Sequence, residues 1–126
     1  MSWFDGWVEK ARQHLASARL LREHGLLRDS MARLYYSAFS LMVAVCGEPP
    51  SGRWKHKGIL KEFFRRLNQV GVRLDEESRE LLIVFYDKRR EADYTLEDIL
   101  LEEVVSYENL VNRLFEVVDD WREKQP

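Results

Sequence analysis

The sequence predicts an all-α fold, an up-and-down four-helix bundle with one additional short helix. Apolar residues recur at spacings of three and four along nearly the whole chain, and no stretch shows the apolar–polar alternation of a strand. The interruptions between these segments are short, which favours antiparallel neighbours. The chain has 126 residues, the size of one domain, so we expect a single helical domain over residues 1–126.

Two long amphipathic segments open the chain. The first runs from about Trp3 to Glu23 and stops near Gly25, a residue type favoured just past a helix end. The second runs from about Asp29 to Cys46, with Asp29 as its candidate N-cap. Cys46 is the only cysteine, which excludes an internal disulfide and a cysteine-based zinc site. It ends an apolar run, and we expect it to be a small buried hydrophobe.

Three further segments follow the Gly- and Pro-rich loop at 47–52. A shorter helix is expected over about 55–70, and this is the added helix of the bundle. The fourth segment begins after Asp75, a second candidate cap. The fifth follows Thr95, whose spacing to Asp98 resembles a capping box.

The composition is that of a globular chain with a heavily charged surface, 45% hydrophobic and 33% charged. The formal net charge of -2 excludes a global basic field, so any site for a polyanion must be local. No stretch approaches the roughly 20 apolar residues of a membrane span, and no signal peptide is visible. We therefore expect a cytoplasmic protein without a membrane partner.

One basic residue stands where the core pattern should continue. The apolar stripe of the fourth segment includes Leu82 and Phe85, and its next position is Arg89. Asp93 lies one turn further, at the i+4 spacing of an ion pair, with Tyr94 beside it. An unpaired buried guanidinium is costly, so Arg89 needs a partner. The pair is either a structural end to the helix or a way of holding Arg89 to bind phosphate.

A local basic segment spans residues 53–66, where six Lys and Arg residues, among them Lys57, accompany a single acidic residue, Glu62. It opens after a loop, so amides at the helix start could add affinity for an anion. Trp54 offers a surface for stacking a base or an anchor for a partner protein. The alternative is an ordinary solvated face. The strongly acidic last helix either complements this segment, within the molecule or across an oligomer, or serves solubility.

The three histidines differ in their surroundings. His14 and His24 have no carboxylate or cysteine spacing around them, and we expect both on the surface. His56 alone lies in a rich polar setting. The chain contains no Glu-x-x-His, no His-x-x-x-His and no Gly-rich phosphate loop, so we expect neither a metal site nor a cofactor.

Three short motifs follow one another along the chain, at residues 35–39, at His56 and at residues 89–94, and they resemble those of prokaryotic HEPN domains. Residues 35–39, Tyr-Tyr-Ser-Ala-Phe, resemble the family's Tyr-Tyr-Ala-x-Phe signature. His56, within Lys-His-Lys-Gly, resembles the start of the family's third helix. The stretch from Arg89 to Tyr94 resembles the Arg-x-x-Ala-Asp-Tyr element of one HEPN branch. The resemblance covers nearly the whole chain.

The resemblance implies a helical bundle that dimerises through the faces carrying these motifs. Many members are toxins of toxin–antitoxin pairs, whose partner is a small nucleotidyltransferase-like protein. Active members are metal-independent ribonucleases that present an Arg and a nearby following His at the dimer interface. Attack by the 2′-hydroxyl leaves 2′,3′-cyclic phosphate ends, while the Arg stabilises the developing charge and the His moves a proton.

This sequence departs from that pattern, because no His follows His56 and Tyr94 stands at the nearest equivalent position after Arg89. A tyrosine of ordinary pKa, near ~10, is a poor base at neutral pH. The leading hypothesis is therefore a homodimeric HEPN protein that binds nucleotide or RNA phosphate and has a nucleotidyltransferase-like antitoxin. The expected site comprises Arg89 as phosphate contact, Asp93 as its orienter, and Tyr36, Tyr94, His56 and Lys57 around them.

Two alternatives stay open at this point. In the first, the bundle is a non-catalytic assembly module, and the Arg89–Asp93 pair is fully buried and satisfied. In the second, the protein is a metal-independent ribonuclease with Arg89 and His56 as catalytic residues. The second alternative requires that the fold bring these two side chains to one site.

Overall fold

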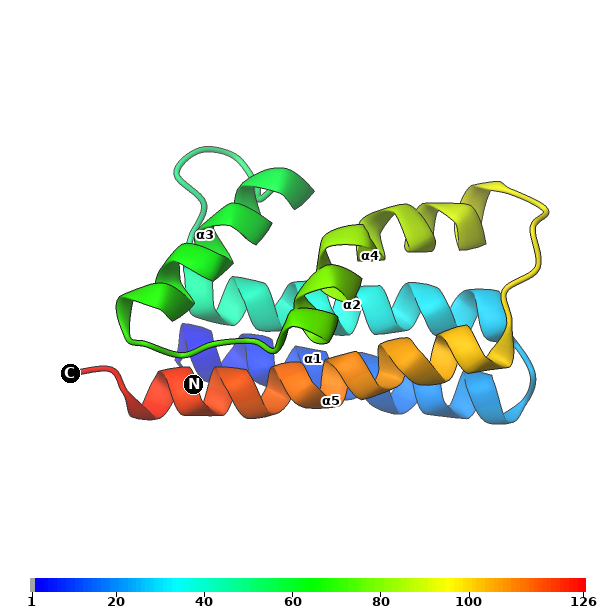
Figure 1. The fold of residues 1–126 in the computed structure, drawn as a ribbon, viewed down its shortest axis with the longest axis horizontal. Helices are drawn as coiled ribbons and strands as arrows, with labels where there is room; N and C mark the ends of the chain where they lie inside the picture. The colour runs from blue at the N-terminus through cyan, green and yellow to red at the C-terminus, as the bar shows by residue number, and fades with distance from the viewer. Residues whose placement is uncertain (1) are drawn as a thin grey trace.

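The computed structural model describes residues 2–126, and these form five α-helices and no strand (Figure 1). The helices are α1 (Trp3–Glu23), α2 (Leu27–Cys46), α3 (His56–Gln69), α4 (Glu76–Tyr94) and α5 (Leu101–Glu123). The predicted all-α class is confirmed, and α3, with 14 residues, is the short helix. None of these helices is long and apolar enough to cross a membrane.

The central element is α2, which packs against each of the other four helices. Thirteen of its 20 residues are buried, as expected of a helix that is apolar nearly all round. Two of its buried serines donate to carbonyls of α1, Ser30 to Ala18 at 2.7 Å and Ser37 to Ala11 at 2.8 Å. Small side chains with satisfied hydroxyls let α1 lie close along α2.

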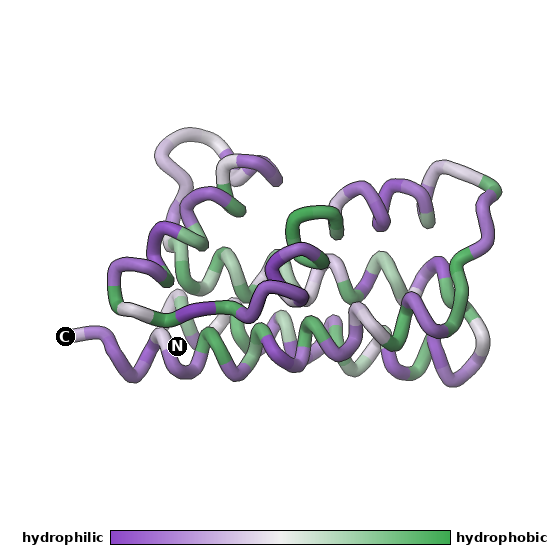
Figure 2. Tube along the Cα trace, viewed as in Figure 1, coloured by the Kyte–Doolittle hydropathy of each residue, from purple (hydrophilic) through white to green (hydrophobic). Residues whose placement is uncertain are grey.

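The helices α1, α2 and α5 run side by side along the long axis, and α3 and α4 lie over α2 on one side of them (Figure 1). Hydrophobic residues are concentrated along α2 and in one turn of α4, residues 81–85 (Figure 2). Buried apolar residues from all five helices form one core. In a regular bundle α2 and α5 would lie diagonally, yet they pack directly, so the up-and-down four-helix description stays a prediction.

One predicted helix cap is confirmed and another is wrong. Asp75 accepts the backbone N–H of Ser78 at 3.1 Å and so caps α4. However, α2 begins at Leu27, two residues before the predicted cap Asp29. Asp29 lies instead in the first turn, where its negative charge favours the helix N-terminus.

The predicted capping box at Thr95 and Asp98 is also wrong. The N-cap of α5 is Leu100, whose N–H donates to Glu103 Oε1 at 3.1 Å. Thr95 instead ends α4, where its hydroxyl donates to the carbonyl of Glu91 at 2.7 Å. A hydroxyl can serve either end of a helix, as acceptor at the start or donor at the end, so the spacing alone did not decide between them.

Candidate functional site

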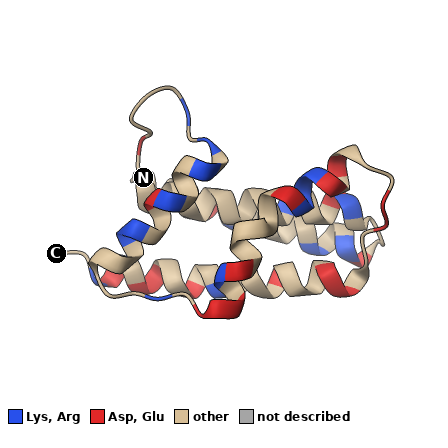
Figure 3. Ribbon diagram, turned by 45° about the horizontal axis from the view of Figure 1, so that its top comes forward, with Lys and Arg blue, Asp and Glu red and all other residues tan. Residues whose placement is uncertain are grey.

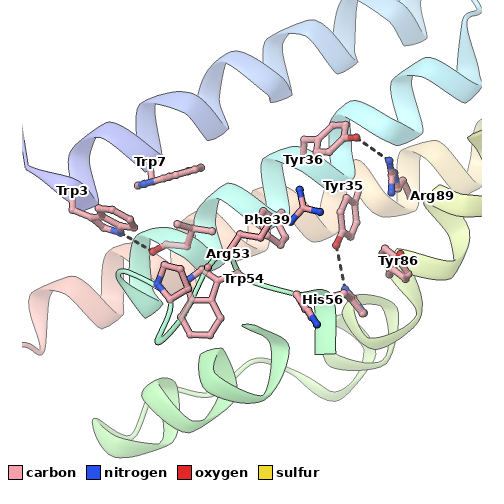
Figure 4. A pocket seen from close by; sticks show the side chains of 14 residues that line it. Trp3, Trp7, Tyr35, Tyr36, Phe39, Arg53, Trp54, His56, Tyr86 and Arg89 are labelled. Atoms are coloured by element: carbon pink, nitrogen blue, oxygen red, sulfur yellow. Dashed lines mark hydrogen bonds between the residues drawn. The ribbon is translucent and has the colours of Figure 1, made fainter. Parts of the chain in front are cut away.

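A groove of about 740 Å³ opens on the face that α2 shares with α3 and α4 (Figure 4), a volume within the usual range of ligand pockets. α2 forms its floor, the start of α1 lines one side, and the loop before α3 lines the other. Its aromatic side chains are Trp3, Trp7, Tyr35, Tyr36, Phe39, Trp54 and Tyr86, and its basic ones are Arg53, Lys55, His56 and Arg89. No Asp or Glu within residues 2–126 lines the groove, so its potential favours anions.

Arg89 reaches the groove from α4. Its Nη2 donates to the hydroxyl of Tyr36 at 2.9 Å, and its Cζ lies 5.3 Å from the Tyr36 ring centroid and 5.7 Å from that of Tyr35. The predicted pair with Asp93 is present, with Nε 3.0 Å from Oδ2. The Nε–H does not point at that oxygen, so the pair is an ion pair without a directed hydrogen bond.

The burial of Arg89 is incomplete. The side chain is 18% exposed and that of Asp93 is 28% exposed. A guanidinium has five N–H donors, and within the described residues only one of them makes a directed hydrogen bond. A fully buried and satisfied pair, which the assembly alternative requires, is therefore not what forms at this position.

The position of Arg89 depends on the end of α4, which α2 holds in place. The guanidinium of Arg28 donates to the carbonyls of Ala92 at 3.2 Å and of Thr95 at 2.8 Å, and also to that of Glu97. The last turn of α4 has no basic residue of its own, so its free carbonyls need donors from elsewhere. The role of Arg28 was not predictable from the sequence, because a partner more than 60 residues away leaves no local pattern.

His56 lines the same groove as Arg89, on the opposite side of Tyr35 (Figure 4). Its Nδ1 lies 3.2 Å from the Tyr35 hydroxyl, and its ring stacks on Tyr86 with centroids 4.5 Å apart. Burial lowers the pKa of His56 below its ordinary value, and Lys57 adds to this while Asp87 opposes it. The imidazole is therefore mostly neutral at neutral pH.

Tyr35 joins the two basic residues without bringing them into contact. Its ring packs edge-on against Phe85, which in turn lies 4.2 Å from the ring of Tyr107. Burial raises the pKa of the Tyr35 phenol well above its ordinary value, against the opposing effect of Arg89. Tyr35 thus keeps its proton and can either donate to or accept from His56.

The structure places the remaining predicted site residues outside the groove. Asp93 contacts Arg89 but lines a second depression, of about 480 Å³, which it shares with Tyr36. Lys57 is exposed on the first turn of α3. Tyr94 is 71% exposed, and its ring lies 5.9 Å from the guanidinium of Arg90. A role for these three side chains in binding stays a prediction.

Two tryptophans of the groove, Trp3 and Trp7, were not predicted as site residues from the sequence, whereas Trp54 was predicted as a stacking surface or a partner anchor. The indole N–H of Trp3 donates to the carbonyl of Val43 at 2.9 Å, and that of Trp54 donates to the carbonyl of Gly47 at 2.8 Å. The available signal was the i,i+4 spacing of Trp3 and Trp7, which puts both rings on one helix face.

The other polar predictions have mixed outcomes. Cys46 is buried as predicted, and burial raises the pKa of its thiol to about 12. His24 is exposed as predicted, but His14 is half-buried, with its ring 5.7 Å from that of Tyr36. No group of three or more His, Cys, Asp and Glu side chains in the described chain is arranged to hold a metal ion.

The basic segment and the acidic helix do not neutralise each other. Lys and Arg positions follow one another along α3 (Figure 3), and Glu62 within it pairs with Arg65 and Arg66. These hydrogen bonds lower the pKa of Glu62 to about 2. Within residues 2–126 the cross-helix ion pairs of α5 run to α1 and α4 and not to α3. Within the described part of the molecule, the acidic residues of α5 therefore pair with α1 and α4 and not with the basic segment.

Comparison with known proteins adds two findings. A family model described as HEPN domain matches residues 4–123. A protein of Methanocaldococcus jannaschii named "Putative toxin MJ0605" is 31% identical over 99 residues, which cover 79% of this chain and 73% of that protein. The region that the family model matches covers the five helices and the groove lining except for Trp3, the first residue of α1.

Proposed function

The chain belongs to the HEPN family, and from that premise we propose that it is a toxin-like protein that binds nucleotide or RNA phosphate in the groove, with Arg89 as the phosphate contact. The observation that supports the proposal most strongly is the position of Arg89 in a groove that is lined by basic and aromatic side chains. Among the described residues, no Asp or Glu lines this groove. A planar guanidinium binds phosphate through two parallel hydrogen bonds and keeps its charge at any physiological pH.

The neighbours of Arg89 have complementary roles in this proposal. Asp93 orients the guanidinium from within α4, and the Tyr36 hydroxyl steadies it from α2. Asp93 lies outside the groove lining, so its carboxylate offsets part of the Arg89 charge without occupying the groove itself. Lys57 and Tyr94 would meet only those parts of a longer ligand that extend beyond the groove.

The partners follow from the family and from the name of the relative. We propose a homodimer that brings two grooves together, and an antitoxin of the nucleotidyltransferase type. Light scattering coupled to size-exclusion chromatography tests the homodimer, and we expect a mass near twice the 15.1 kDa of one chain. Co-purification with the product of a neighbouring reading frame tests the second.

The decisive experiment compares two arginine variants. Wild type should bind a labelled single-stranded RNA at low salt, where phosphate contacts are strongest. Arg89→Ala should reduce this affinity at least tenfold. Arg12→Ala is the matched control, because it removes the same charge from an exposed pair with Glu9 outside the groove. Equal affinities of the two variants, or no binding by wild type, would contradict the proposal.

A second candidate function, metal-independent RNA cleavage, has one observation in its favour, since Arg89 and His56 line one groove. If Nδ1–H of His56 donates to Tyr35, Nε2 is free as a base. It would take the proton of a 2′-hydroxyl while the 2′-oxygen bonds to phosphorus. The bond from phosphorus to the 5′-oxygen would break, that oxygen would take a proton from water, and the product would be a 2′,3′-cyclic phosphate; Arg89 would stabilise the charge on the phosphoryl oxygens.

Cleavage is tested with RNA and a chelator. Wild type should produce 2′,3′-cyclic ends without metal, and His56→Ala should abolish them while retaining RNA binding. Cleavage that persists in His56→Ala, or that is absent in wild type despite binding, rejects this candidate and leaves the binding proposal standing.

A further inference from the structure

The groove has two chemically different ends. Arg89 and His56 lie at the end closed by α4, and Trp3, Trp7 and Trp54 lie at the other end, between α1 and the loop before α3 (Figure 4). The flat apolar surface is therefore concentrated at the tryptophan end, while positive charge is present at both ends, from Arg89 at one and from Arg53 and Lys55 beside Trp54 at the other. A ligand that uses both must carry a negative charge and an aromatic ring on the same molecule.

The tryptophan rings are held in place by the fold. The N–H groups of Trp3 and Trp54 donate to backbone carbonyls at 2.9 Å and 2.8 Å, which fixes the plane of each indole. The rings of Trp3 and Trp7 are tilted by 45° with centroids 5.8 Å apart, so they do not cover each other's faces as a parallel stack would. A surface that is already ordered loses little entropy when a ligand arrives.

We propose that this aromatic end is a base subsite, in which an unpaired base of a single-stranded RNA stacks on the tryptophans while a neighbouring phosphate lies at Arg89. This inference rests on the proposed function and names its substrate class. Bases in a duplex are already stacked on each other, so their faces are not available to an indole, whereas an unpaired base exposes both faces.

The fixed indoles also determine how selective the subsite is. Trp has a single donor, and those of Trp3 and Trp54 are both occupied by the backbone. Recognition of a particular base requires several hydrogen bonds to its edge, but Trp3 and Trp54 have only their ring faces left to present, and Trp7 has a single donor. The subsite therefore accepts any of the four bases with similar affinity, and sequence preference has to come from elsewhere.

An apolar peptide is the competing occupant, and the charge of the groove argues against it. Arg53, Lys55, His56 and Arg89 line the groove with no Asp or Glu among the described lining residues. Arg89 has Asp93 as a counterion and His56 is mostly neutral, but an apolar segment would still cover Arg53 and Lys55 without supplying a negative charge, which is costly. A nucleic acid brings one negative charge per nucleotide and so compensates their positive charge.

The test uses two probes that differ only in their bases. One is a 2′-O-methyl oligoadenylate, which lacks the attacking hydroxyl, and the other is an abasic strand of the same length and backbone. Trp54→Ala should weaken binding of the oligoadenylate about tenfold and leave the abasic strand unchanged. Trp54→Phe, which keeps a stacking face, should retain most of the affinity. Arg89→Ala should weaken both probes.

The outcomes separate this inference from the proposed function. If Arg89→Ala weakens both probes and Trp54→Ala weakens neither, the base subsite is wrong and phosphate binding stands. If neither probe binds wild type at low salt, both proposals fail. Loss of both probes in Trp54→Ala also overturns the subsite, because a base contact cannot affect an abasic strand. Should Trp54→Ala fail to fold, Trp7→Ala is measured in the same way.

Selectivity supplies an independent check. Oligomers of A, U and C with the same backbone should bind within a few-fold of one another, and a duplex of equal length should bind more weakly. A preference of a hundredfold for one base would contradict recognition by ring faces alone. Unchanged oligonucleotide binding by Trp54→Ala, together with loss of a co-purifying protein, would assign the aromatic end to that protein.

Discussion

Two clusters in this protein pair arginine with a carboxylate, one around Glu108 and one at Arg89 and Asp93. They differ in whether the arginine side chain remains available to a ligand. Glu108 of α5, with a side chain 12% exposed, lies 3.0 Å from Nε of Arg19 and 3.1 Å from Nε of Arg22, both on α1. Arg89 and Asp93 pair within a single helix, and the guanidinium lines a groove. The first cluster joins two helices that are far apart in sequence, whereas the second joins one turn to the next.

The difference shows how to recognise an arginine that is available to a ligand. The Glu108 carboxylate is shared by two cations from another helix, and Arg19 donates further to Asn112 at 3.1 Å. Such a cluster holds α1 against α5. The Arg89–Asp93 pair lies within one helix, and among the described residues only one hydrogen bond, to Tyr36 of α2, connects Arg89 to another helix, so we expect Arg89 to contribute less to stability than Glu108.

The largest effect is expected from Glu108→Ala. The substitution removes the carboxylate shared by Arg19 and Arg22 and leaves Arg22 partly buried without a counterion. Hydrogen bonds to charged groups support a loss of about 2 to 3 kcal/mol in the free energy of unfolding. Chemical denaturation measures it. The RNA affinity of the folded fraction should be unchanged. A loss of affinity would show that the Glu108 cluster also contributes to binding.

A smaller effect, on binding and not on stability, is expected from Arg89→Lys. Lysine keeps the positive charge but loses the planar fork, so affinity for single-stranded RNA should fall about tenfold. The free energy of unfolding should change by less than about 1 kcal/mol, because Asp93 is partly exposed and the pair lies within one helix. If Arg89→Lys lost much stability but kept full affinity for RNA, the Arg89 cluster would have a structural role like that of the Glu108 cluster.

Next in size is Asp75→Ala, which probes an exposed carboxylate. Asp75 caps α4 and also lies 3.3 Å from Nε of Arg113. Loss of the cap should lower the free energy of unfolding by about 1 kcal/mol, while the exposed ion pair adds little. Asp75→Asn, which retains a capping oxygen, is the matched control and should keep most of the stability. Equal losses in the two variants would attribute the effect to charge instead.

The smallest effect concerns pH. Burial lowers the pKa values of both His56 and His14 below their ordinary value of 6.5. Each folded pKa lies below the unfolded one, so the unfolded state binds more protons, and the free energy of unfolding falls as pH drops below about 6.5. His56→Gln should make the decline between pH 7 and 5.5 shallower. A steeper decline in the variant would mean that protonated His56 stabilises the fold.

Local features of the chain were predictable because their causes are local. Helical periodicity predicted α1 at Trp3–Glu23 and α3 within a residue at each end, and i,i+4 geometry predicted the Arg89–Asp93 pair. The cap at Asp75 and the burial of Cys46 belong to the same group. The error at Thr95 arose where one local signal fits two positions, the end of one helix and the start of the next.

By itself, then, the sequence determined the helical segments, the order of the motifs and the spacing that pairs Arg89 with Asp93. Only the tertiary structure decided that His56 and Arg89 lie on either side of Tyr35, that Arg28 holds the end of α4, and that α1 and the loop before α3 face each other with their tryptophans. Helix geometry is set by contacts three and four residues apart, which a sequence displays directly. The groove is made by contacts between residues tens of positions apart, and these exist only once the helices have packed on α2.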